Sequence, residues 1–400
     1  MPLTILSDDD LRTLLHSLTQ SDILDLQEVL SDALHQYSTG LAEDNNPCCA
    51  TLQPARSHIK RPDGQTTLFM PASSASAMGV KIVTLAEPQL DGTIGLNPTP
   101  PDTSDLTLLD GSGRLRALLN AAEITAFRTA LASTLLFRRR ANVHDVLIFG
   151  AGKQAYWHAR LALLLRGPDV HHLNIINRSF ERAANLIREL YKTPWPVEIE
   201  HPVAKIVTPN HGEYARHLKS LVRGAAVIFC TTPSLSALFP PEILTHTEGR
   251  RKGRYIAAIG SYKPHMIEIH PDVIRQAVAK DDAHHRHFHK HAKQGGAIIV
   301  DSVESCMREA GEVIQAGLGG RDVVELGELV MLKREDSGDS KKSGKSEKEG
   351  KDPNASLKEW LERGNVIYKS VGLGLMDVVI GSELVRLADE REIGTRLKRF

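Results

Sequence analysis

The stretch "VLIFGAGKQAYWHARLALLL", residues 146–165, joins an apolar run to two closely spaced glycines and a helix-like continuation. A continuous apolar run is typical of a parallel strand that is buried on both faces. Gly150, Gly152 and Ala155 match the pattern G-x-G-x-x-[GA] between a strand and a helix, the context in which this pattern is informative. The stretch therefore predicts the strand, turn and helix of a dinucleotide-binding fold.

Each position of this turn has its own physical task in such a fold. Gly150 allows the tight turn, Gly152 lets the backbone approach a pyrophosphate, and Ala155 keeps the helix close to the strand. The backbone N–H groups at the start of the helix, at Lys153 and Gln154, are expected to face the anion. The alternative interpretation is a glycine-rich turn that binds no ligand.

The end of the next apolar run, "LNIIN" at residues 173–177, indicates which nucleotide is bound. Dinucleotide folds usually place an acid here that accepts a hydrogen bond from the ribose 2′-hydroxyl, but this chain has Asn177. Arg178 and Ser179 follow and supply a cation and small donors where a 2′-phosphate would lie. These residues favour NADPH, with NADH as the alternative if Arg178 only stacks on the adenine.

Further apolar runs repeat the alternation of strand and helix that predicts an α/β fold with a doubly wound parallel sheet, a Rossmann domain. Thr231 and Thr232 end one run and Gly260 ends the next, at the edge where this fold binds the ribose and nicotinamide. An equally good interpretation of the two threonines is that small residues form the turn after a strand. The runs are "LNIIN" (173–177), "AVIFCTT" (226–232), "RYIAAIG" (254–260) and "AIIVDS" (297–302).

The two ends of the chain predict a second, discontinuous α+β domain. "LSDDDLRTLLHSL", residues 6–18, has Ser7 as the expected N-cap of a helix. Between about residues 50 and 110, short apolar segments alternate with Gly, Pro, Asn and Asp, as strands and turns do. We expect one domain from residues 1–128 and 366–400, and a nucleotide-binding domain from residues 129–365.

The composition is that of an ordinary globular protein with no dominant charge. Lys and Arg number 49 and so do Asp and Glu, which leaves no global field to attract nucleic acid or an anionic membrane. No apolar run approaches the roughly 20 residues of a membrane span, and we expect a cytoplasmic protein. The cysteines show no metal-ligand spacing, and no metal is expected; they are Cys48, Cys49, Cys230 and Cys306.

Two insertions interrupt the nucleotide-binding domain. The tract "HHRHFHKH", residues 284–291, could bind a metal through its imidazoles, but nothing nearby supplies a fixed ligand geometry, so a solvated loop is the preferred interpretation. The second insertion, around residues 333–356, mixes both charges with Ser and Gly and lacks any large apolar residue. Such a segment cannot offset its own ordering entropy, and we expect it to be disordered.

Several separate blocks, in this order along the chain, resemble those of the ornithine cyclodeaminase/mu-crystallin family. A glycine turn alone would be a weak signal, but the ordered set is specific. The resemblance implies that the discontinuous domain binds the substrate and forms a homodimer. The blocks include "QPARSHI" (53–59), "FMPASSASAMGVKIVTL" (69–85), "EITAFRTALAS" (123–133), "GAGKQAYWH" (150–158), "AAIGSYKPHMIEI" (257–269) and "KSVGLGLMD" (369–377).

The resemblance also implies which residues meet the substrate. The family uses three cations on the substrate carboxylate, and the matching positions here are Arg56, Lys81 and Arg128, which we take as the catalytic group. A planar guanidinium can bind a carboxylate through two bonds, and a compact ammonium can also handle a proton. Asp377 matches a family acid beside the pocket, although the usual Glu-Asp pair is Met-Asp in this chain.

One departure from the family pattern separates its activities. Cyclodeaminases have an Asp two residues after the glycine that ends a strand, and here that position is Tyr262, following Gly260. A phenol with a pKa near 10 cannot act as a resting carboxylate base, so cyclodeaminase chemistry is disfavoured. Tyr262 could instead donate a hydrogen bond to the substrate or only line the pocket.

The branch of the family without that Asp reduces cyclic ketimine carboxylates. The resemblance therefore implies an oxidoreductase that uses NADPH to reduce such a substrate to a cyclic amino acid, with Lys81 as the candidate that tunes or delivers the proton. The alternatives are an NAD(P)-dependent amino-acid dehydrogenase, a cyclodeaminase, and a protein that binds NADPH without turnover.

Overall fold

The computed structural model describes residues 2–40, 51–62, 65–86, 103–196, 199, 201–250, 252–279, 297–330 and 355–398. The chain divides into two compact units. Unit 1 comprises Met1–Arg128, Pro194–Pro196 and Leu373–Phe400, and unit 2 comprises Thr129–Thr193 and Val197–Gly372.

Unit 2 is built on a sheet in which every strand pairs in parallel with its neighbours. Its order is β13-β12-β14-β11-β10-β7-β8-β9, so the direction of chain progress reverses between β7 and β10. This is the predicted Rossmann arrangement, and the reversal marks the edge where such folds bind ligands. The strands are β7 (Asp145–Phe149), β8 (His172–Ile176), β9 (Val203–Val207), β10 (Val227–Cys230), β11 (Tyr255–Ala258), β12 (Ile298–Val300), β13 (Val323–Glu325) and β14 (Val366–Lys369).

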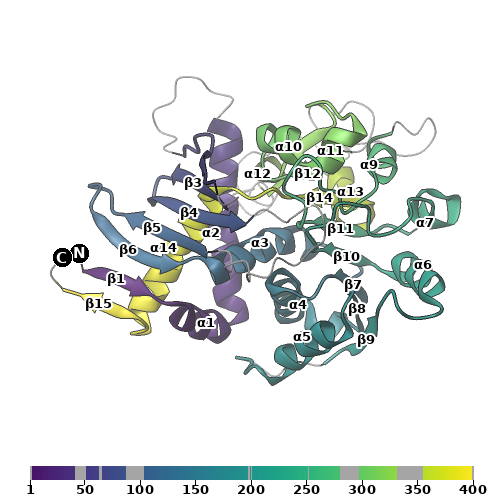
Figure 1. The fold of residues 1–400 in the computed structure, drawn as a ribbon, viewed down its shortest axis with the longest axis horizontal. Helices are drawn as coiled ribbons and strands as arrows, with labels where there is room; N and C mark the ends of the chain where they lie inside the picture. The colour runs from purple at the N-terminus through teal and green to yellow at the C-terminus, as the bar shows by residue number, and fades with distance from the viewer. Residues whose placement is uncertain are drawn as a thin grey trace, which may run out of the picture. The chain divides into compact units, whose positions relative to one another are not determined.

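The strands of unit 2 form because their apolar runs are buried on both faces. All residues of β10, β11, β12 and β14 are buried, as are the last four residues of β7. Figure 1 shows α4 and α5 on one side of the strands and α6, α7 and α9 on the other. The helices are α4 (Lys153–Arg166), α5 (Phe180–Lys192), α6 (Tyr214–Gly224), α7 (Glu242–Thr245), α8 (Thr247–Arg250), α9 (Pro271–Val278), α10 (Val303–Glu309), α11 (Gly311–Ala316), α12 (Leu326–Val330) and α13 (Ala355–Arg363), with a 3-10 turn at Gly167–Asp169.

Unit 1 contains a seven-stranded sheet of order β15-β1-β6-β5-β4-β3-β2. Its neighbouring strands are antiparallel, except that β1 and β6 are parallel. The region predicted to be sheet, about residues 50 to 110, contains four of these strands. The strands are β1 (Leu3–Leu6), β2 (Ser57–Lys60), β3 (Gln65–Ser73), β4 (Met78–Ala86), β5 (Thr103–Leu109), β6 (Leu115–Asn120) and β15 (Thr395–Leu397).

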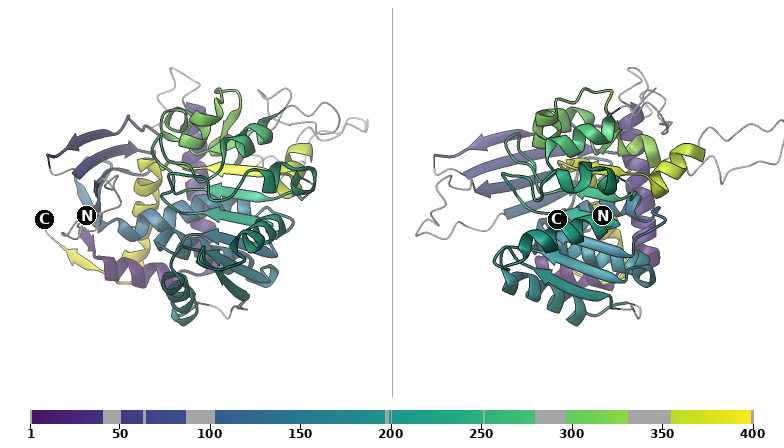
Figure 2. Two further views of the ribbon diagram at one scale, coloured as in Figure 1. Left: turned by 45° about the vertical axis from the view of Figure 1, so that its right-hand side comes forward. Right: turned by 90° about the vertical axis from the view of Figure 1, so that its right-hand side faces the viewer.

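The helix α14 (Gly374–Glu390) lies against the sheet of unit 1 and contacts β3, β4 and β5 (Figures 1 and 2). Gly381 makes this close approach possible, because a Cβ at that position would lie 2.4 Å from Cδ2 of Leu106. The other helices of unit 1 are α1 (Asp8–Ser17), α2 (Gln20–Gly40) and the first part of α3 (Ala122–Phe137).

The start of α1 confirms the predicted N-cap. The hydroxyl of Ser7 accepts a hydrogen bond from the backbone N–H of Asp10 at 3.2 Å, and the carboxylate of Asp10 accepts from the backbone N–H of Ser7 at 2.9 Å. This reciprocal capping box satisfies two donors that the helix itself cannot.

The structure places two boundaries differently from the sequence analysis. Residues 366–372 belong to unit 2 and not to the first domain, because β14 pairs with β11 and β12 inside the sheet of that unit. Of the insertion expected at 333–356, residues 333–354 lie outside the described part of the chain. Residues 355 and 356 begin α13. This helix has the amphipathic sequence "ASLKEWLER", which contains the large apolar residues that the earlier part of the insertion lacks.

Three other sequence features lie outside the described residues: the histidine tract 284–291, Cys48 and Cys49. Among the described residues, Cys230 and Cys306 are buried free thiols. No group of three or more metal-ligating side chains occurs in the described ranges. Within the same ranges, no helix is both long and apolar enough to cross a membrane.

Candidate functional site

Three of the residues predicted to meet the substrate come together inside unit 1. Lys81 on β4 donates a hydrogen bond from Nζ to Oδ1 of Asp377 on α14 at 2.8 Å. Its Nζ also donates to the hydroxyl of Thr125 on α3 at 2.6 Å. Nε of Arg128, one turn further along α3, lies 3.3 Å from Oδ2 of Asp377. One carboxylate therefore holds two cations, and Thr125 is a member of this group that the sequence analysis missed.

Burial sets the electrostatics of this group, which we call the cation cluster (Lys81, Arg128, Asp377 and Thr125). Lys81 is 2% exposed, Arg128 4% and Asp377 0%. Burial, opposed by the charge of Asp377 and assisted by that of Arg128, lowers the pKa of Lys81 to about 8. An ammonium with this pKa can give up a proton near neutral pH, which an ordinary lysine cannot.

Arg56 belongs to the same surroundings but is half-buried. Its charge contributes to the lowering of the pKa of Lys81. The segment that carries it is fastened to the start of α14, because Oε1 of Gln53 accepts a hydrogen bond from the backbone N–H of Leu375 at 2.7 Å. The three predicted cations thus act on one region of unit 1.

The Met376 position shows the effect of the departure from the family's Glu-Asp pair. Nη1 of Arg128 lies 3.6 Å from the sulfur of Met376, which is fully buried. A thioether is only a weak hydrogen-bond acceptor, so this side of the guanidinium keeps its capacity to bind an anion. Among the described residues, Asp377 is the acid that forms an ion pair with Arg128.

In unit 2, the turn between β7 and α4 has the conformation that its glycines predict. Gly150 has a φ of +115°, and a Cβ there would lie 2.6 Å from Oγ1 of Thr231. Gly152 is exposed and precedes the first residue of α4, which no side chain caps. A Cβ at Gly152 would meet nothing within 4 Å. Ala155 is fully buried. The backbone N–H groups at Gly152, Lys153 and Gln154 can thus face an anion.

This geometry predicts different stabilities for two alanine variants of the turn. Gly150→Ala is expected to lower the free energy of unfolding by about 1–3 kcal/mol, because a side chain is strained at this φ. Gly152→Ala should change it by less than about 1 kcal/mol, because its φ is −103° and the space around it is open. Urea unfolding of both variants measures the difference, and equal losses would contradict the assignment of strain to Gly150.

At the end of β8 the predicted nucleotide-selecting residues form a short turn into α5. Nδ2 of Asn177 donates to the backbone oxygen of Ser179 at 2.8 Å, while Arg178 is exposed. The hydroxyl of Ser179 caps α5 and also donates to Oε2 of Glu181 at 3.0 Å. The carboxylate of Glu181, which no motif of the sequence singles out, would oppose a 2′-phosphate at Ser179, so a preference for NADPH depends on Arg178.

The ends of β10 and β11 carry the remaining predicted nucleotide residues. The hydroxyl of Thr231 donates to the backbone oxygen of Phe149 at 2.7 Å, which ties the end of β10 to β7. The backbone N–H of Thr232 and that of Gly260 both donate to the carboxylate of Glu268, at 2.6 and 2.7 Å. The hydroxyl of Thr232 donates to the same carboxylate at 3.2 Å, so both threonine hydroxyl groups hold the turns in place.

Glu268, together with Glu312 and Lys369, forms a buried group that the sequence analysis missed. All three are at most 1% exposed. Two of them lie in blocks quoted for the family resemblance, "AAIGSYKPHMIEI" and "KSVGLGLMD", but a charged residue inside an apolar block has no local signal that separates burial from exposure.

Tyr262 belongs to unit 2, whereas the cation cluster belongs to unit 1. It is half-buried, and Nζ of Lys263 lies 5.8 Å from the centre of its ring. His158, on α4, is fully buried and bonds to the backbone oxygen of Gln154 and the hydroxyl of Ser133, and burial lowers its pKa to about 4. A neutral imidazole in such a position is a structural residue of the unit.

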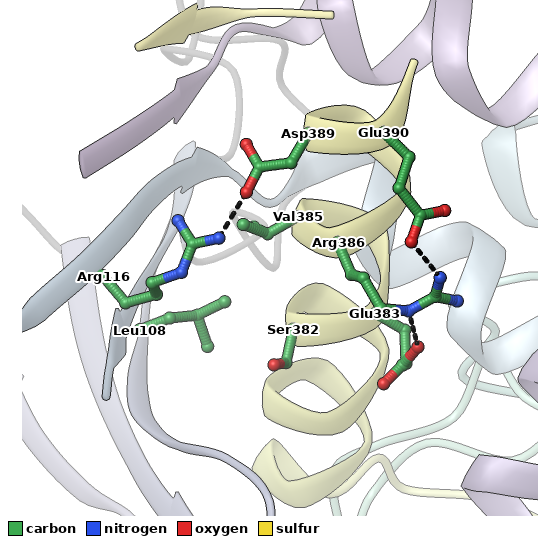
Figure 3. Close-up of a pocket in the computed structure, with 8 residues that line it drawn as sticks. All are labelled: Leu108, Arg116, Ser382, Glu383, Val385, Arg386, Asp389 and Glu390. Carbon is green, nitrogen blue, oxygen red and sulfur yellow. Dashed lines mark hydrogen bonds and ion pairs between the residues drawn. The ribbon is translucent and has the colours of Figure 1, made fainter. Parts of the chain in front are cut away.

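A pocket of about 430 Å³ lies on unit 1, over the C-terminal half of α14 (Figure 3). Figure 3 shows Arg386 between Glu383 and Glu390, and Arg116 directed at Asp389. Its charges are thus paired within the pocket wall, and none of the predicted site residues lines it. The lining residues are Leu108, Arg116, Ser382, Glu383, Val385, Arg386, Asp389 and Glu390.

Two relatives match three quarters or more of the chain. A Δ1-pyrroline-2-carboxylate reductase of Bacillus cereus is 26% identical over 394 residues, which cover 95% of this chain and 97% of the relative. The ketimine reductase mu-crystallin of Rattus norvegicus is 27% identical over 308 residues, covering 75% of this chain and 80% of the relative. Both are named as reductases of C=N compounds, the class of enzyme that the sequence predicts.

A solved structure agrees with the fold. The Δ1-pyrroline-2-carboxylate reductase of Thermococcus litoralis, in complex with NADH and L-proline, has a TM-score of 0.68 and 19% identity, and covers 98% of this chain and 99% of its own. The expected combination of a Rossmann domain with a second domain is therefore confirmed.

The family model supports the same conclusion from the sequence. It matches residues 10–326, a range that spans the cations on β4 and α3, the glycine turn and Glu268. The chain belongs to the ornithine cyclodeaminase/mu-crystallin family.

Proposed function

We propose that the protein uses NADPH to reduce a cyclic ketimine carboxylate, of the pyrroline- or piperideine-2-carboxylate type, to a cyclic L-amino acid. The observation that carries the proposal is the cation cluster of unit 1, in which one buried carboxylate faces Lys81 and Arg128. Two cations and one anion leave an excess of positive charge in this cluster, and the charge of Arg56 also acts on Lys81. An anionic substrate would neutralise this excess.

The relatives support the reaction class. Two of them are named as a Δ1-pyrroline-2-carboxylate reductase and a ketimine reductase, and each name describes a substrate with a C=N bond. The solved structure from Thermococcus litoralis contains NADH and L-proline, a cyclic amino acid that such a reduction produces.

The residues of unit 1 have separate tasks in the proposed reaction. Arg56 and Arg128 bind the substrate carboxylate, and Asp377 fixes Arg128 and Lys81 in place. Lys81 gives its proton to the imine nitrogen, which forms an N–H bond as the C=N double bond becomes single. When bound, reduced nicotinamide supplies the hydride for the carbon of that bond. A pKa of about 8 makes Lys81 acidic enough for this transfer.

The residues of unit 2 fit a dinucleotide. Gly152 leaves open space beside an uncapped helix start, where a pyrophosphate would bind to backbone N–H groups. Asn177, Arg178 and Ser179 would then bind the adenine ribose, and Thr231, Thr232 and Gly260 would lie beside the nicotinamide half.

Replacing Arg178 with alanine tests the preference for NADPH. We expect kcat/KM with NADPH to fall by about tenfold or more, because a hydrogen bond between charged groups is lost, while kcat/KM with NADH stays within about twofold. Arg188→Ala, at an exposed arginine of α5, the helix that follows Arg178, serves as the matched control. An equal loss with both nucleotides would show that Arg178 stacks on the adenine instead of binding a phosphate.

The proposal is tested by following NADPH oxidation with five- and six-membered cyclic imino acids, in parallel with NADH. Oxidation in proportion to the cyclic amino acid formed is the expected result. Conversion of ornithine to proline with no net change in the cofactor would replace the proposal by a cyclodeaminase. Tight binding of NADPH without any turnover would replace it by a non-catalytic binding protein.

We also propose, as the family resemblance implies, that the protein acts as a homodimer built through unit 1. The edge strand β2 of this unit supports the idea, because all of its residues are exposed. Edge strands with open backbone groups are usually covered in stable proteins.

A further inference from the structure

A buried carboxylate joins the two turns of unit 2 that follow β10 and β11. Oε1 of Glu268 accepts from the backbone N–H of Thr232 at 2.6 Å and from its hydroxyl at 3.2 Å. Oε2 accepts from the backbone N–H of Gly260 at 2.7 Å. The side chain of one residue thus bridges two separate turns.

The two bridged turns are in direct backbone contact. A Cβ at Gly260 would lie 2.1 Å from the backbone oxygen of Thr232, which leaves no room for any side chain there. The turn after β10 also touches the glycine turn, since a Cβ at Gly150 would meet Oγ1 of Thr231. A change in the position of Glu268 would therefore move backbone at the edge of the sheet.

Further buried groups hold Glu268 itself. Its backbone N–H donates to Oε1 of Glu312 on α11 at 2.8 Å, and the hydroxyl of Ser261 donates to the same oxygen. Nζ of Lys369 on β14 donates to the backbone oxygen of Ser261 and lies 3.6 Å from Oε2 of Glu312. These contacts fix the backbone of Glu268, from which its side chain reaches the two turns.

In a doubly wound fold, the two halves of a dinucleotide bind on opposite sides of the point where the strand order reverses. Here that point lies between β7 and β10, so β10 and β11 belong to the half beyond the glycine turn. The adenine half would therefore bind at the ends of β7 and β8, and the nicotinamide half would bind at the two turns that Glu268 bridges.

We propose that Glu268 is a positioning residue for the nicotinamide half of the cofactor: by accepting from Thr232 and Gly260 it fixes the two turns against which the nicotinamide and its ribose bind. The inference rests on the proposed function, because it takes a dinucleotide as the ligand. It assigns no contact between Glu268 and the cofactor.

The chemistry of the bridge requires the ionised carboxylate. Both oxygens of Glu268 face backbone N–H groups, which are donors only. In Glu268→Gln the amide nitrogen would place a second donor against one of these N–H groups, so the bridge would keep one contact and lose the other. Protonation of the carboxylate has the same effect on one oxygen.

The bridge is therefore expected to weaken as the pH falls. Burial, together with the charge of Glu312 and against that of Lys369, raises the pKa of Glu268 to about 7. Among the described residues, the charge of Glu268 also acts on the thiol of Cys230 on β10, whose own pKa is raised well above its usual range chiefly by burial. As the pH falls through about 7, the carboxylate of Glu268 gains a proton.

Two ligands distinguish binding of the nicotinamide half from binding of the rest of the cofactor. They are NADPH and 2′-phospho-ADP-ribose, which lacks the nicotinamide. Their affinities for the wild type and for Glu268→Gln are measured by titration calorimetry at pH 8. We expect the variant to bind NADPH about ten- to a hundredfold more weakly, because a bond to a charged acceptor is lost, and to bind 2′-phospho-ADP-ribose within about twofold of the wild type. The loss of affinity should raise KM for NADPH more than it lowers kcat.

A matched control is Glu325→Gln, which changes another buried carboxylate that accepts a backbone N–H, that of Val303 at 2.8 Å. It lies on β13, the edge strand of the same sheet. The control should leave both affinities unchanged. Thermal unfolding of all three proteins records any general loss of structure.

The outcomes separate the inference from the proposed function. If the wild type binds neither ligand, the proposed function fails and the inference fails with it. If the wild type binds both and Glu268→Gln either keeps both affinities or loses both equally, the inference alone is overturned. Should the variant not fold, the wild type decides: the ratio of the two affinities must fall at least threefold from pH 8 to pH 6, and a constant ratio overturns the inference.

Discussion

Replacing Lys81 with methionine is expected to lower kcat for the reduction of a cyclic imino acid by about two to four orders of magnitude. A positioned general acid contributes a factor of this size, and methionine has a similar length but no proton to give. Lys81 is 2% exposed and is held by Asp377 and Thr125. An acid from the solvent could therefore not replace it as the proton donor. The measurement is steady-state NADPH oxidation with a saturating imino acid.

The pH dependence of the same reaction tests the role of Lys81 independently. Because its pKa is lowered to about 8, the ammonium loses its proton as the pH rises through this value. The rate of the wild type should therefore fall above about pH 8, and the residual rate of the methionine variant should be level there. Lys219→Met, at an exposed lysine of α6, is the control and should keep the full rate. An unchanged kcat in Lys81→Met would remove Lys81 from the mechanism.

Replacing Asp377 with asparagine is expected to reduce the free energy of unfolding by about 3–5 kcal/mol. Removal of one partner from a buried ion pair leaves the other charge without compensation, and here two cations, Lys81 and Arg128, would be left. The asparagine has nearly the same shape, so loss of packing adds little. Chemical denaturation of the purified variant measures the change.

The control for this variant lies on the same helix. Glu390→Gln removes an exposed carboxylate that pairs with Arg386 at 2.7 Å (Figure 3). Surface pairs of this kind contribute about 0–1 kcal/mol, so the variant should remain close to the wild type in stability. If Asp377→Asn is no less stable than Glu390→Gln, the cation cluster is not buried as described.

The local parts of the fold could be predicted from the sequence because neighbouring residues determine them. The apolar run before Gly150 is a strand because all of its side chains can be buried between helices, and the turn after it follows from two glycines. Ser7 and Asp10 begin a helix through contacts three residues apart. The family blocks added the cations of β4 and α3, which no local pattern distinguishes from surface charges.

The parts that could not be predicted depend on contacts between distant residues. Lys81 and Asp377 are separated by 296 positions in the sequence, and their ion pair has no periodicity that would reveal it. The same holds for Glu268, which bonds to Thr232 36 residues earlier. The boundary at residue 366 was misplaced because an apolar run predicts a strand but does not indicate which sheet will accept it.

The position of β14 has a consequence for how the protein is made. This strand is the last of its sheet to leave the ribosome, yet it lies between β11 and β12, which are synthesised earlier. Until residue 369 has emerged, β12 and β13 have no neighbour through which to join the rest of the sheet. Parallel pairings over such sequence distances form slowly. Nascent chains stopped before β14 should therefore expose apolar strand edges, which favours aggregation until β14 is made.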